Sequence, residues 1–149
     1  MSFNEVYENL WIGGFPEDVA ELRPFARIVM VAPLREHERI DPVDPPHTTR
    51  TLYSPFTDDI QPPSERERLI ALHAARFAVE GLRAQQKTIV LCREGKNRSG
   101  LVVALALTQL TGCPGAAAIR IVQAARPHAL YNVYFRELLE GIGAKEILT

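Results

Sequence analysis

The segment KTIVLCREGKNRSGLVVALALTQLTG, residues 87–112, constrains the fold more than any other part of the chain. Its first six residues predict a buried β-strand that ends at Cys92. A charged loop of five residues follows, and a nearly all-apolar run from Ser99 then predicts a buried helix that stops at Gly112. A buried strand that leads through a short loop into a buried helix is typical of α/β folds.

Three other short segments predict strands. They are NLWIGG at residues 9–14, expected to be an edge strand that ends in a turn at Gly13 and Gly14, RIVMVAP at 27–33 and TRTLYSPF at 49–56. With residues 87–92 they indicate a central, mostly parallel sheet of four to five strands flanked by helices. Residues 33–49, rich in proline and charge, are expected to form a surface loop.

The remaining segments predict helices. Within residues 62–86, Ser64 and Glu67 have the spacing of a capping box, and an apolar face is expected from Leu69, Leu72, Phe77, Val79 and Leu82. Two more helices are expected within residues 114–127 and 130–143. Asn132 is a candidate cap or loop brace and Arg126 a surface arginine or the partner of a carboxylate near the site; no chemistry is assigned to either.

Length and charge indicate one small domain over residues 1–149. The chain has 17 Lys and Arg against 18 Asp and Glu, a net charge of −1, which argues against nucleic acid as a partner. There is no secretory signal pattern, and no apolar run approaches the roughly 18 residues of a membrane span. We expect a cytoplasmic protein with no membrane span. The sequence does not fix the oligomeric state, for which a monomer is the working expectation.

The loop between Cys92 and Arg98 has the composition of an anion-binding site. Backbone N–H groups of such a loop, with the helix N-terminus behind it, form a cradle for anions. Gly95 lets the backbone approach the anion, and Arg98 offers a planar fork that matches two phosphate oxygens. The same field favours the thiolate form of Cys92, which is the nucleophilic form. The predicted phosphate-binding residues are Arg93, Glu94, Gly95, Lys96, Asn97 and Arg98.

Cys92, Gly95, Arg98 and Ser99 match the C-x-x-G-x-x-R-S signature of the cysteine-dependent protein tyrosine phosphatase superfamily. The late position of the motif resembles the dual-specificity branch. ENLWIGG, SPFTDDIQPP and AIRIVQAARPHALYNVYFRELL are similar to the opening strand, acid loop and closing helices of that branch. The resemblance implies a phosphocysteine at Cys92, phosphate held by Arg98, a hydroxyl at Ser99 that helps the thiolate leave, and no metal or cofactor.

Two neighbouring aspartates compete for the role of general acid. Asp58 fits the phrasing of acid loops in the family, in which proline, an apolar residue and any residue precede the catalytic aspartate. Counting back from Pro62 and Pro63 favours Asp59 instead. We expect Asp58, with Asp59 as the alternative and Asp41 or Asp44 in the proline-rich loop as the next candidates.

The substrate is less constrained than the chemistry. The leading expectation is a phosphoprotein or phosphopeptide with phosphotyrosine, while phosphoserine and phosphothreonine stay open. Arg93 and Lys96 resemble residues of phosphoinositide phosphatases, and NRSG resembles RNA 5′-triphosphatases, so a phosphoinositide or RNA 5′-phosphate phosphatase is an alternative. Leu91 replaces the histidine that usually precedes the nucleophile, which leaves a weakly active phosphate-binding pseudophosphatase as an alternative of another class.

Overall fold

The computed structural model of the protein describes residues 3–38 and 50–143. Five strands form one sheet in the order β1-β2-β5-β3-β4, and β1 alone among them runs antiparallel to its neighbour. The strands are β1 Phe3–Tyr7, β2 Leu10–Gly14, β3 Arg27–Met30, β4 Arg50–Tyr53 and β5 Thr88–Cys92. The predicted α/β class with a mostly parallel sheet is confirmed.

The prediction that residues 9–14 form an edge strand is wrong. The edge is taken by β1, which pairs with β2 through a tight turn where Asn9 adopts a φ of 65°. Gly13 and Gly14 do not form a turn, because both continue β2 alongside β5. Gly14 is a glycine for another reason: a Cβ there would lie 2.9 Å from the carbonyl oxygen of Arg93, so the loop after β5 packs on bare backbone.

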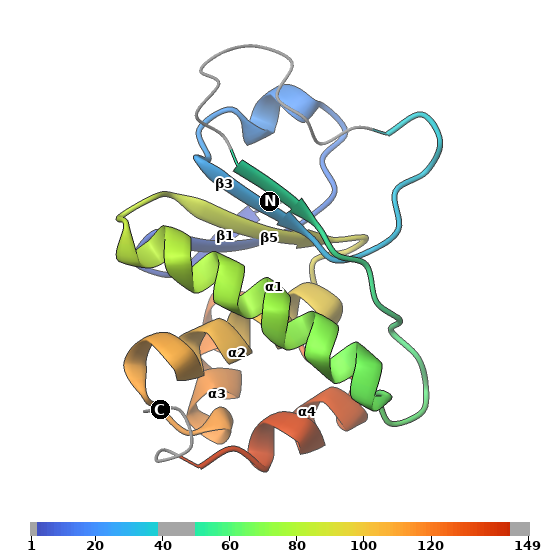
Figure 1. Ribbon diagram of the computed structural model, residues 1–149, viewed down its shortest axis with the longest axis vertical. Coiled ribbons are helices and arrows are strands. Elements are labelled where there is room, and N and C mark those ends of the chain that lie inside the picture. The colour runs from blue at the N-terminus through green and yellow to red at the C-terminus, as the bar shows by residue number, and fades with distance from the viewer. Residues whose placement is uncertain (1–2, 39–49, 144–149) are drawn as a thin grey trace.

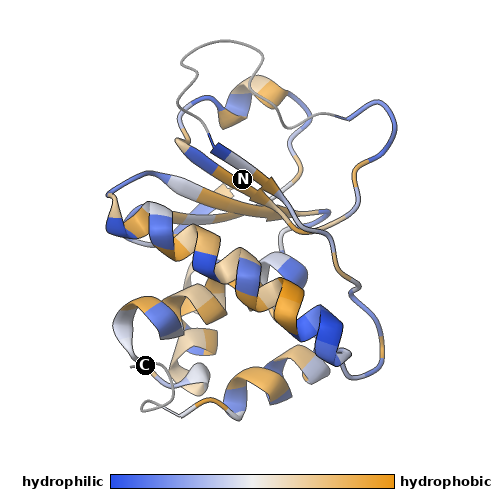
Figure 2. Ribbon diagram, in the orientation of Figure 1, coloured by the Kyte–Doolittle hydropathy of each residue, from blue (hydrophilic) through white to orange (hydrophobic). Residues whose placement is uncertain are grey.

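Four α-helices lie on one side of the sheet, and the 3-10 helix η1, Val19–Leu22, lies on the other (Figure 1). The helices are α1 Glu65–Arg83, α2 Arg98–Thr111, α3 Gly115–Ala125 and α4 Val133–Glu140. Figure 2 shows the hydrophilic first turn of α1 in blue at the right-hand end of the helix.

The helix α2 lies at the centre of this layer. It contacts β2, β5 and the other three helices, and all its residues from Ser99 to Thr108 are buried. It ends at Gly112, which has the left-handed φ of 76°. The predicted buried helix with a glycine stop is confirmed, and it fixes the residues that follow Cys92 against the core.

Alanines, more than the leucines, form the packing face of α1. Leu69 is 59% exposed and Leu72 is 36% exposed, so the predicted apolar face is wrong at these two positions. The buried residues of the helix are Ala71, Ala74, Ala75, Ala78, Val79, Gly81 and Leu82. Small side chains allow α1 to lie close to β3, β5 and α2, while Leu69 and Leu72 lie outside this packing face.

The predicted capping box at the start of α1 is confirmed and does more than cap the helix. The Ser64 hydroxyl accepts from the Glu67 N–H at 3.1 Å, and the Glu67 carboxylate accepts from the Ser64 N–H at 2.9 Å. The second oxygen of Glu67 accepts from the Thr57 N–H at 3.2 Å. These hydrogen bonds, above all that from the Ser64 backbone, lower the pKa of Glu67. Glu67 therefore ties α1 to the segment that carries Asp58.

We predict that Glu67→Ala destabilises the protein more than Ser64→Ala. Loss of the Ser64 hydroxyl removes one cap at a cost of about 1 kcal/mol. Loss of Glu67 leaves two backbone donors without their charged acceptor, at a cost of about 2 kcal/mol. Urea unfolding measures both free energies. Glu65→Ala removes a first-turn acid that makes no capping bond and serves as the control; an effect as large as that of Glu67→Ala would contradict the assignment.

Candidate active site

A cleft of about 730 Å³ opens where β2 and β5 end at the carboxyl edge of the sheet. Ligands of open α/β sheets commonly bind at this edge. The cleft is lined by Phe15, Pro16, Glu17 and Val19 after β2, by Arg35, His37 and Glu38 after β3, by Asp58 and Tyr131, and by Cys92, Arg93, Glu94, Lys96, Asn97 and Arg98. Most residues predicted for the site therefore line a single cleft.

The thiol of Cys92 lies at the buried end of the cleft. The residue is 3% exposed, and its Sγ lies 3.2 Å from the Oγ of Ser99, a hydrogen bond in which either group can donate. Ser99 is fully buried in the first turn of α2. The strand–loop–helix sequence thus brings the predicted nucleophile and the predicted hydroxyl into contact. The other free thiol, Cys113, follows α2 and does not line the cleft.

Donors outside the loop of residues 93–97 hold three of its carbonyl groups. The carbonyl oxygens of Arg93, Glu94 and Lys96 accept from Phe15 N at 3.4 Å, Arg126 Nη2 at 2.9 Å and Leu130 N at 3.0 Å. These donors belong to the segment after β2 and to the connection between α3 and α4. The surrounding elements therefore fix the orientation of the loop peptides.

The N–H groups of the same loop are left free. Within the part of the chain that the structure describes, no backbone N–H of residues 94–98 donates a hydrogen bond. Asn97, the N-cap of α2, makes no side-chain capping bond, so the helix N-terminus stays open. Free N–H groups held in place beside an open helix N-terminus form an anion-binding cradle.

Arg98 adds a side-chain donor to this cradle. Its Nη1 donates to the carbonyl of Phe56 at a long 3.4 Å, while its Nε is buried and has no hydrogen-bond partner among the described residues. An unpaired buried donor costs about 1–3 kcal/mol. A bound anion would supply the missing acceptor, as the planar fork of the guanidinium suggests.

Gly95 has a stricter reason to be glycine than the predicted approach to an anion. Its φ is 70°, and a Cβ there would lie 2.3 Å from the carbonyl carbon of Gly13. The loop backbone therefore packs directly against the backbone of β2, with no side chain between them. This contact, which joins residues far apart in the sequence, sets the shape of the cradle.

The structure balances the positive charges that the sequence places in the loop. Arg93 makes a two-pronged ion pair with Glu38, with N–O distances of 2.7 and 2.9 Å. Lys96 Nζ lies 3.8 Å from the carboxylate of Glu94. Nothing in the sequence pattern pointed to Glu38, because it belongs to the predicted surface loop, 55 residues before Arg93.

The two candidate aspartates have different surroundings. Asp58 lines the cleft, and its carboxylate accepts from Asn97 Nδ2 at 3.1 Å and from Asn132 Nδ2 at 2.7 Å. The carboxylate of Asp59 accepts from the Ile60 N–H and the Gln61 amide of its own loop, and Asp59 does not line the cleft. Asp41 and Asp44 lie outside the described residues.

Asn132 and Arg126, to which the sequence assigned no chemistry, both contact the site. The Asn132 Oδ1 caps α4 by accepting from Tyr134 N at 2.9 Å. An asparagine directly before a helix is a common cap, so the sequence does predict this contact. Its Nδ2 holds Asp58, which only the fold brings near. Arg126 bridges Asn4 Oδ1 and the Glu94 carbonyl, and burial lowers its pKa.

Leu91, which occupies the position of the usual histidine, is fully buried in β5 between β2 and β3. Its side chain supplies no hydrogen-bonding group to the loop.

Within residues 3–38 and 50–143, no cluster of three or more His, Cys, Asp or Glu is arranged to hold a metal ion. No helix in these described ranges is long and apolar enough to cross a membrane.

Comparison with known proteins identifies the fold. No family model and no curated protein matches the sequence. Human DUSP28 matches at 21% identity and a TM-score of 0.75, over 99% of this chain and 95% of that chain. PTPMT1 in complex with PI(5)P matches at 20% identity and a TM-score of 0.75, over 99% and 97%. Tk-PTP in the active form matches at 22% identity and a TM-score of 0.70, over 98% and 95%.

The fold is therefore that of the dual-specificity and protein tyrosine phosphatases, as the motif at Cys92 suggested. The likeness extends along almost the whole chain and almost the whole of each matched structure.

The ion pair between Glu38 and Arg93 gives a prediction about pH. The hydrogen bond with Arg93 lowers the pKa of Glu38 from 4.5 to about 2. Folding thus favours the ionised carboxylate, so the stabilisation is complete above about pH 4.5 and is lost as the pH falls through about 2. We expect Glu38→Gln to lower the free energy of unfolding by about 2 kcal/mol at pH 7. The difference from the unsubstituted protein should shrink between pH 5 and pH 2.

Urea unfolding across this pH range measures the difference. Glu17→Gln is the matched control, because Glu17 lines the same cleft but makes no ion pair with another described residue. If the difference in free energy of unfolding between Glu38→Gln and the unsubstituted protein does not change with pH, the ion pair does not stabilise the fold as we expect.

Proposed function

We propose that the protein is a phosphatase that hydrolyses phosphate monoesters through a phosphocysteine at Cys92. The observation that carries this proposal is the set of unpaired N–H groups of residues 94–98 next to the Cys92 thiol. A phosphate held by these groups and by Arg98 would lie against a buried sulfur. The likeness of the fold to solved phosphatases supports the same chemistry.

In the first step the Cys92 thiolate attacks phosphorus, and an S–P bond forms as the P–O bond to the leaving group breaks. The loop N–H groups and Arg98 hold the other phosphate oxygens, which carry charge in the transition state. Asp58 gives its proton to the departing oxygen. Asn97 and Asn132 orient this carboxyl group through the hydrogen bonds at 3.1 and 2.7 Å.

In the second step water replaces the thiolate. Asp58, now a carboxylate, takes a proton from water, a new P–O bond forms and the S–P bond breaks. The Ser99 hydroxyl, 3.2 Å from Sγ, donates to the departing thiolate and stabilises its charge. Inorganic phosphate leaves with the thiolate restored. The nucleophile is a side chain, so these steps draw on no metal-bound water.

Phosphotyrosine in a protein or peptide is the substrate that we propose. Cys92 is only 3% exposed, and a phosphotyrosine carries its phosphate farther from the backbone than a phosphoserine does. Tyr131, 59% exposed, lines the cleft and offers a ring against which an aryl group can pack. Phosphoserine and phosphothreonine are shorter and reach such a thiol less readily.

A phosphoinositide is the second candidate, favoured by two observations. PTPMT1, which shares the fold, has been solved with PI(5)P, and Arg93 and Lys96 are basic residues that line the cleft. The pairing of Arg93 with Glu38 and of Lys96 with Glu94 weighs against a highly anionic substrate. The same pairing of charges gives no support for an RNA 5′-phosphate as substrate.

A weakly active phosphate-binding protein is the alternative of another class. It would be the outcome if the buried Leu91 leaves the Cys92 thiol without sufficient activation.

The Cys92→Ser variant tests covalent catalysis. We expect no measurable turnover of para-nitrophenyl phosphate, because serine does not ionise at neutral pH, while binding of inorganic phosphate in calorimetry is retained. Cys113→Ser, which changes the cysteine outside the cleft, should keep full activity and serves as the control. Substantial turnover by Cys92→Ser would rule out Cys92 as the nucleophile. Phosphate binding without turnover in the unsubstituted protein would favour the binding-protein alternative.

Asp58→Asn and Asp59→Asn decide which aspartate is the acid. A general acid matters most when the leaving oxygen is basic, so we expect Asp58→Asn to lower kcat/KM for phenyl phosphate by about 10²–10⁴-fold. For an aryl phosphate whose leaving group is strongly acidic, the kcat/KM of the same variant should stay close to that of the unsubstituted protein. For Asp59→Asn we expect kcat/KM to depend only weakly on the acidity of the leaving group across the whole series. A steep dependence on leaving-group acidity in the Asp59 variant alone would reverse the assignment.

A further inference from the structure

Arg93 is a cation that lines the cleft directly after the nucleophile, and both of its terminal nitrogens already donate to a carboxylate. Nη1 and Nη2 both donate to the Glu38 carboxylate, at 2.9 and 2.7 Å, and the guanidinium lies 5.4 Å from the centre of the Phe15 ring. Its Nε is buried with no partner among the described residues. The charge of Arg93 is thus offset by the carboxylate of Glu38.

Glu38 is held firmly in this position. Its side chain is only 9% exposed, and it also accepts from the Arg35 N–H at 2.6 Å. Its own N–H donates to the Arg35 carbonyl at 2.9 Å, which closes a turn. The pKa of Glu38, lowered to about 2 by Arg93, keeps the carboxylate ionised at neutral pH. The ion pair is therefore a fixed part of the cleft wall.

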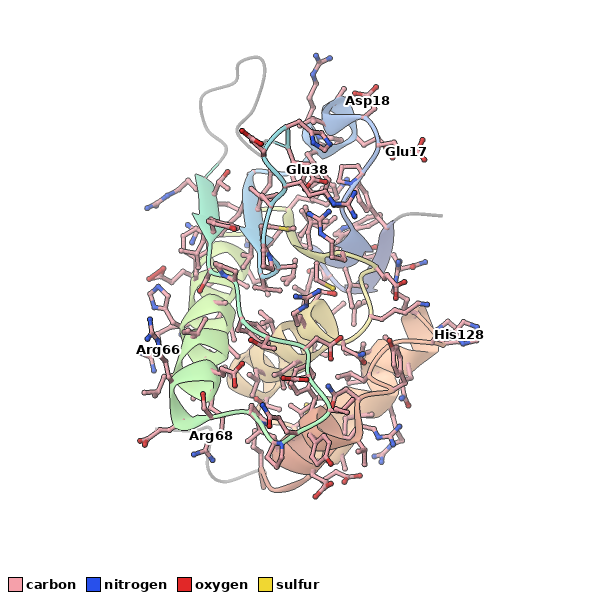
Figure 3. All side chains as sticks on the ribbon, turned by 90° about the vertical axis from the view of Figure 1, so that its right-hand side faces the viewer. Glu17, Asp18, Glu38, Arg66, Arg68 and His128 are labelled. Carbon is pink, nitrogen blue, oxygen red and sulfur yellow. The ribbon has the colours of Figure 1, made fainter. Side chains whose placement is uncertain are left out.

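The charges of the whole cleft are balanced. Apart from His37, its charged lining residues are four basic and four acidic, namely Arg35, Arg93, Lys96 and Arg98 against Glu17, Glu38, Asp58 and Glu94. Glu17, Asp18 and Glu38 lie in the same part of the molecule, far from Arg66 and Arg68 (Figure 3). A second anionic group beside the bound phosphate would meet the Glu38 carboxylate at this wall, where Arg93 is already paired and Arg35 is the other arginine among the described residues that line it.

We propose that Glu38 is a specificity-determining residue that occupies Arg93 and so restricts the cleft to ligands with a single phosphate at the reacting position. The inference deepens the proposed function and rests on it. A ligand with two adjacent phosphates can use the two-pronged face of Arg93 only by displacing the Glu38 carboxylate. Once the carboxylate charge is removed, the second phosphate competes with a neutral side chain for the forked donor of Arg93.

Binding of inorganic phosphate and of pyrophosphate, measured by calorimetry, tests the proposal. Both are titrated into proteins that carry Cys92→Ser, so that neither ligand is turned over. We expect Glu38→Gln in this background to tighten pyrophosphate relative to phosphate by about tenfold, the scale of one charge-assisted hydrogen bond. An unchanged ratio, or loss of phosphate binding by a folded Glu38→Gln protein, would overturn the proposal.

Two further variants separate the release of Arg93 from a general change of charge. Glu17→Gln removes the same charge from the cleft without freeing an arginine. Its affinity for pyrophosphate relative to phosphate should therefore stay within about threefold of that of the Cys92→Ser protein, a change smaller than the loss or gain of one charge-assisted hydrogen bond. The double variant Glu38→Gln with Arg93→Gln should lose the gain for pyrophosphate. A gain in Glu17→Gln equal to that in Glu38→Gln, or one that persists without Arg93, would overturn the role given to the ion pair.

If Glu38→Gln does not fold, Glu38→Asp provides the test, because its shorter carboxylate cannot keep both bonds to Arg93. A smaller shift toward pyrophosphate is then expected, and no shift would overturn the proposal. The binding measurements do not depend on turnover. They decide the role of Glu38 even if the unsubstituted protein hydrolyses no phosphate monoester, a result that would instead reject the proposed function.

Discussion

The candidate site depends on the backbone contact between the loop of residues 93–97 and β2. Gly95 packs on Gly13, and Gly14 packs on the carbonyl of Arg93, with no side chain between the two backbones. In this position the loop carbonyls are held by Phe15, Arg126 and Leu130. Because these donors occupy the carbonyl groups, the peptide planes present their N–H groups on a side where none of the described residues offers an acceptor.

A second consequence of the fold is that Asp58 is held from several elements at once. Phe56 is buried against Phe135 of α4, with ring centres 6.1 Å apart, and anchors the segment before the aspartate. Glu67 of α1 accepts from the Thr57 N–H. Asn97 before α2 and Asn132 before α4 then donate to the carboxylate itself. An aspartate that is exposed and lies in a loop is thereby fixed relative to Cys92.

The electrostatics of the cleft depend on pairing more than on the number of charges. Arg93 and Lys96 made the loop look strongly basic in the sequence, yet each has an acidic neighbour in the fold. Arg98 lines the same cleft, and its Nε has no hydrogen-bond partner among the described residues. Pairing with Glu38 and Glu94 thus reduces the contribution of Arg93 and Lys96 to the attraction for an anion, while Arg98 forms no ion pair with another described residue.

The sequence by itself determined the features that are local. The strand, loop and helix around Cys92, the capping box of Ser64 and Glu67, and the glycine stop at Gly112 each arise within a few residues, where propensity and spacing decide. Only the tertiary structure decided that residues 10–14 are an inner strand and that alanines form the packing face of α1. It alone paired Glu38 with Arg93, 55 residues away, and Asn132 with Asp58, 74 residues away. No pattern in the sequence marks such pairs, because they form only when the sheet brings the ends of its strands together.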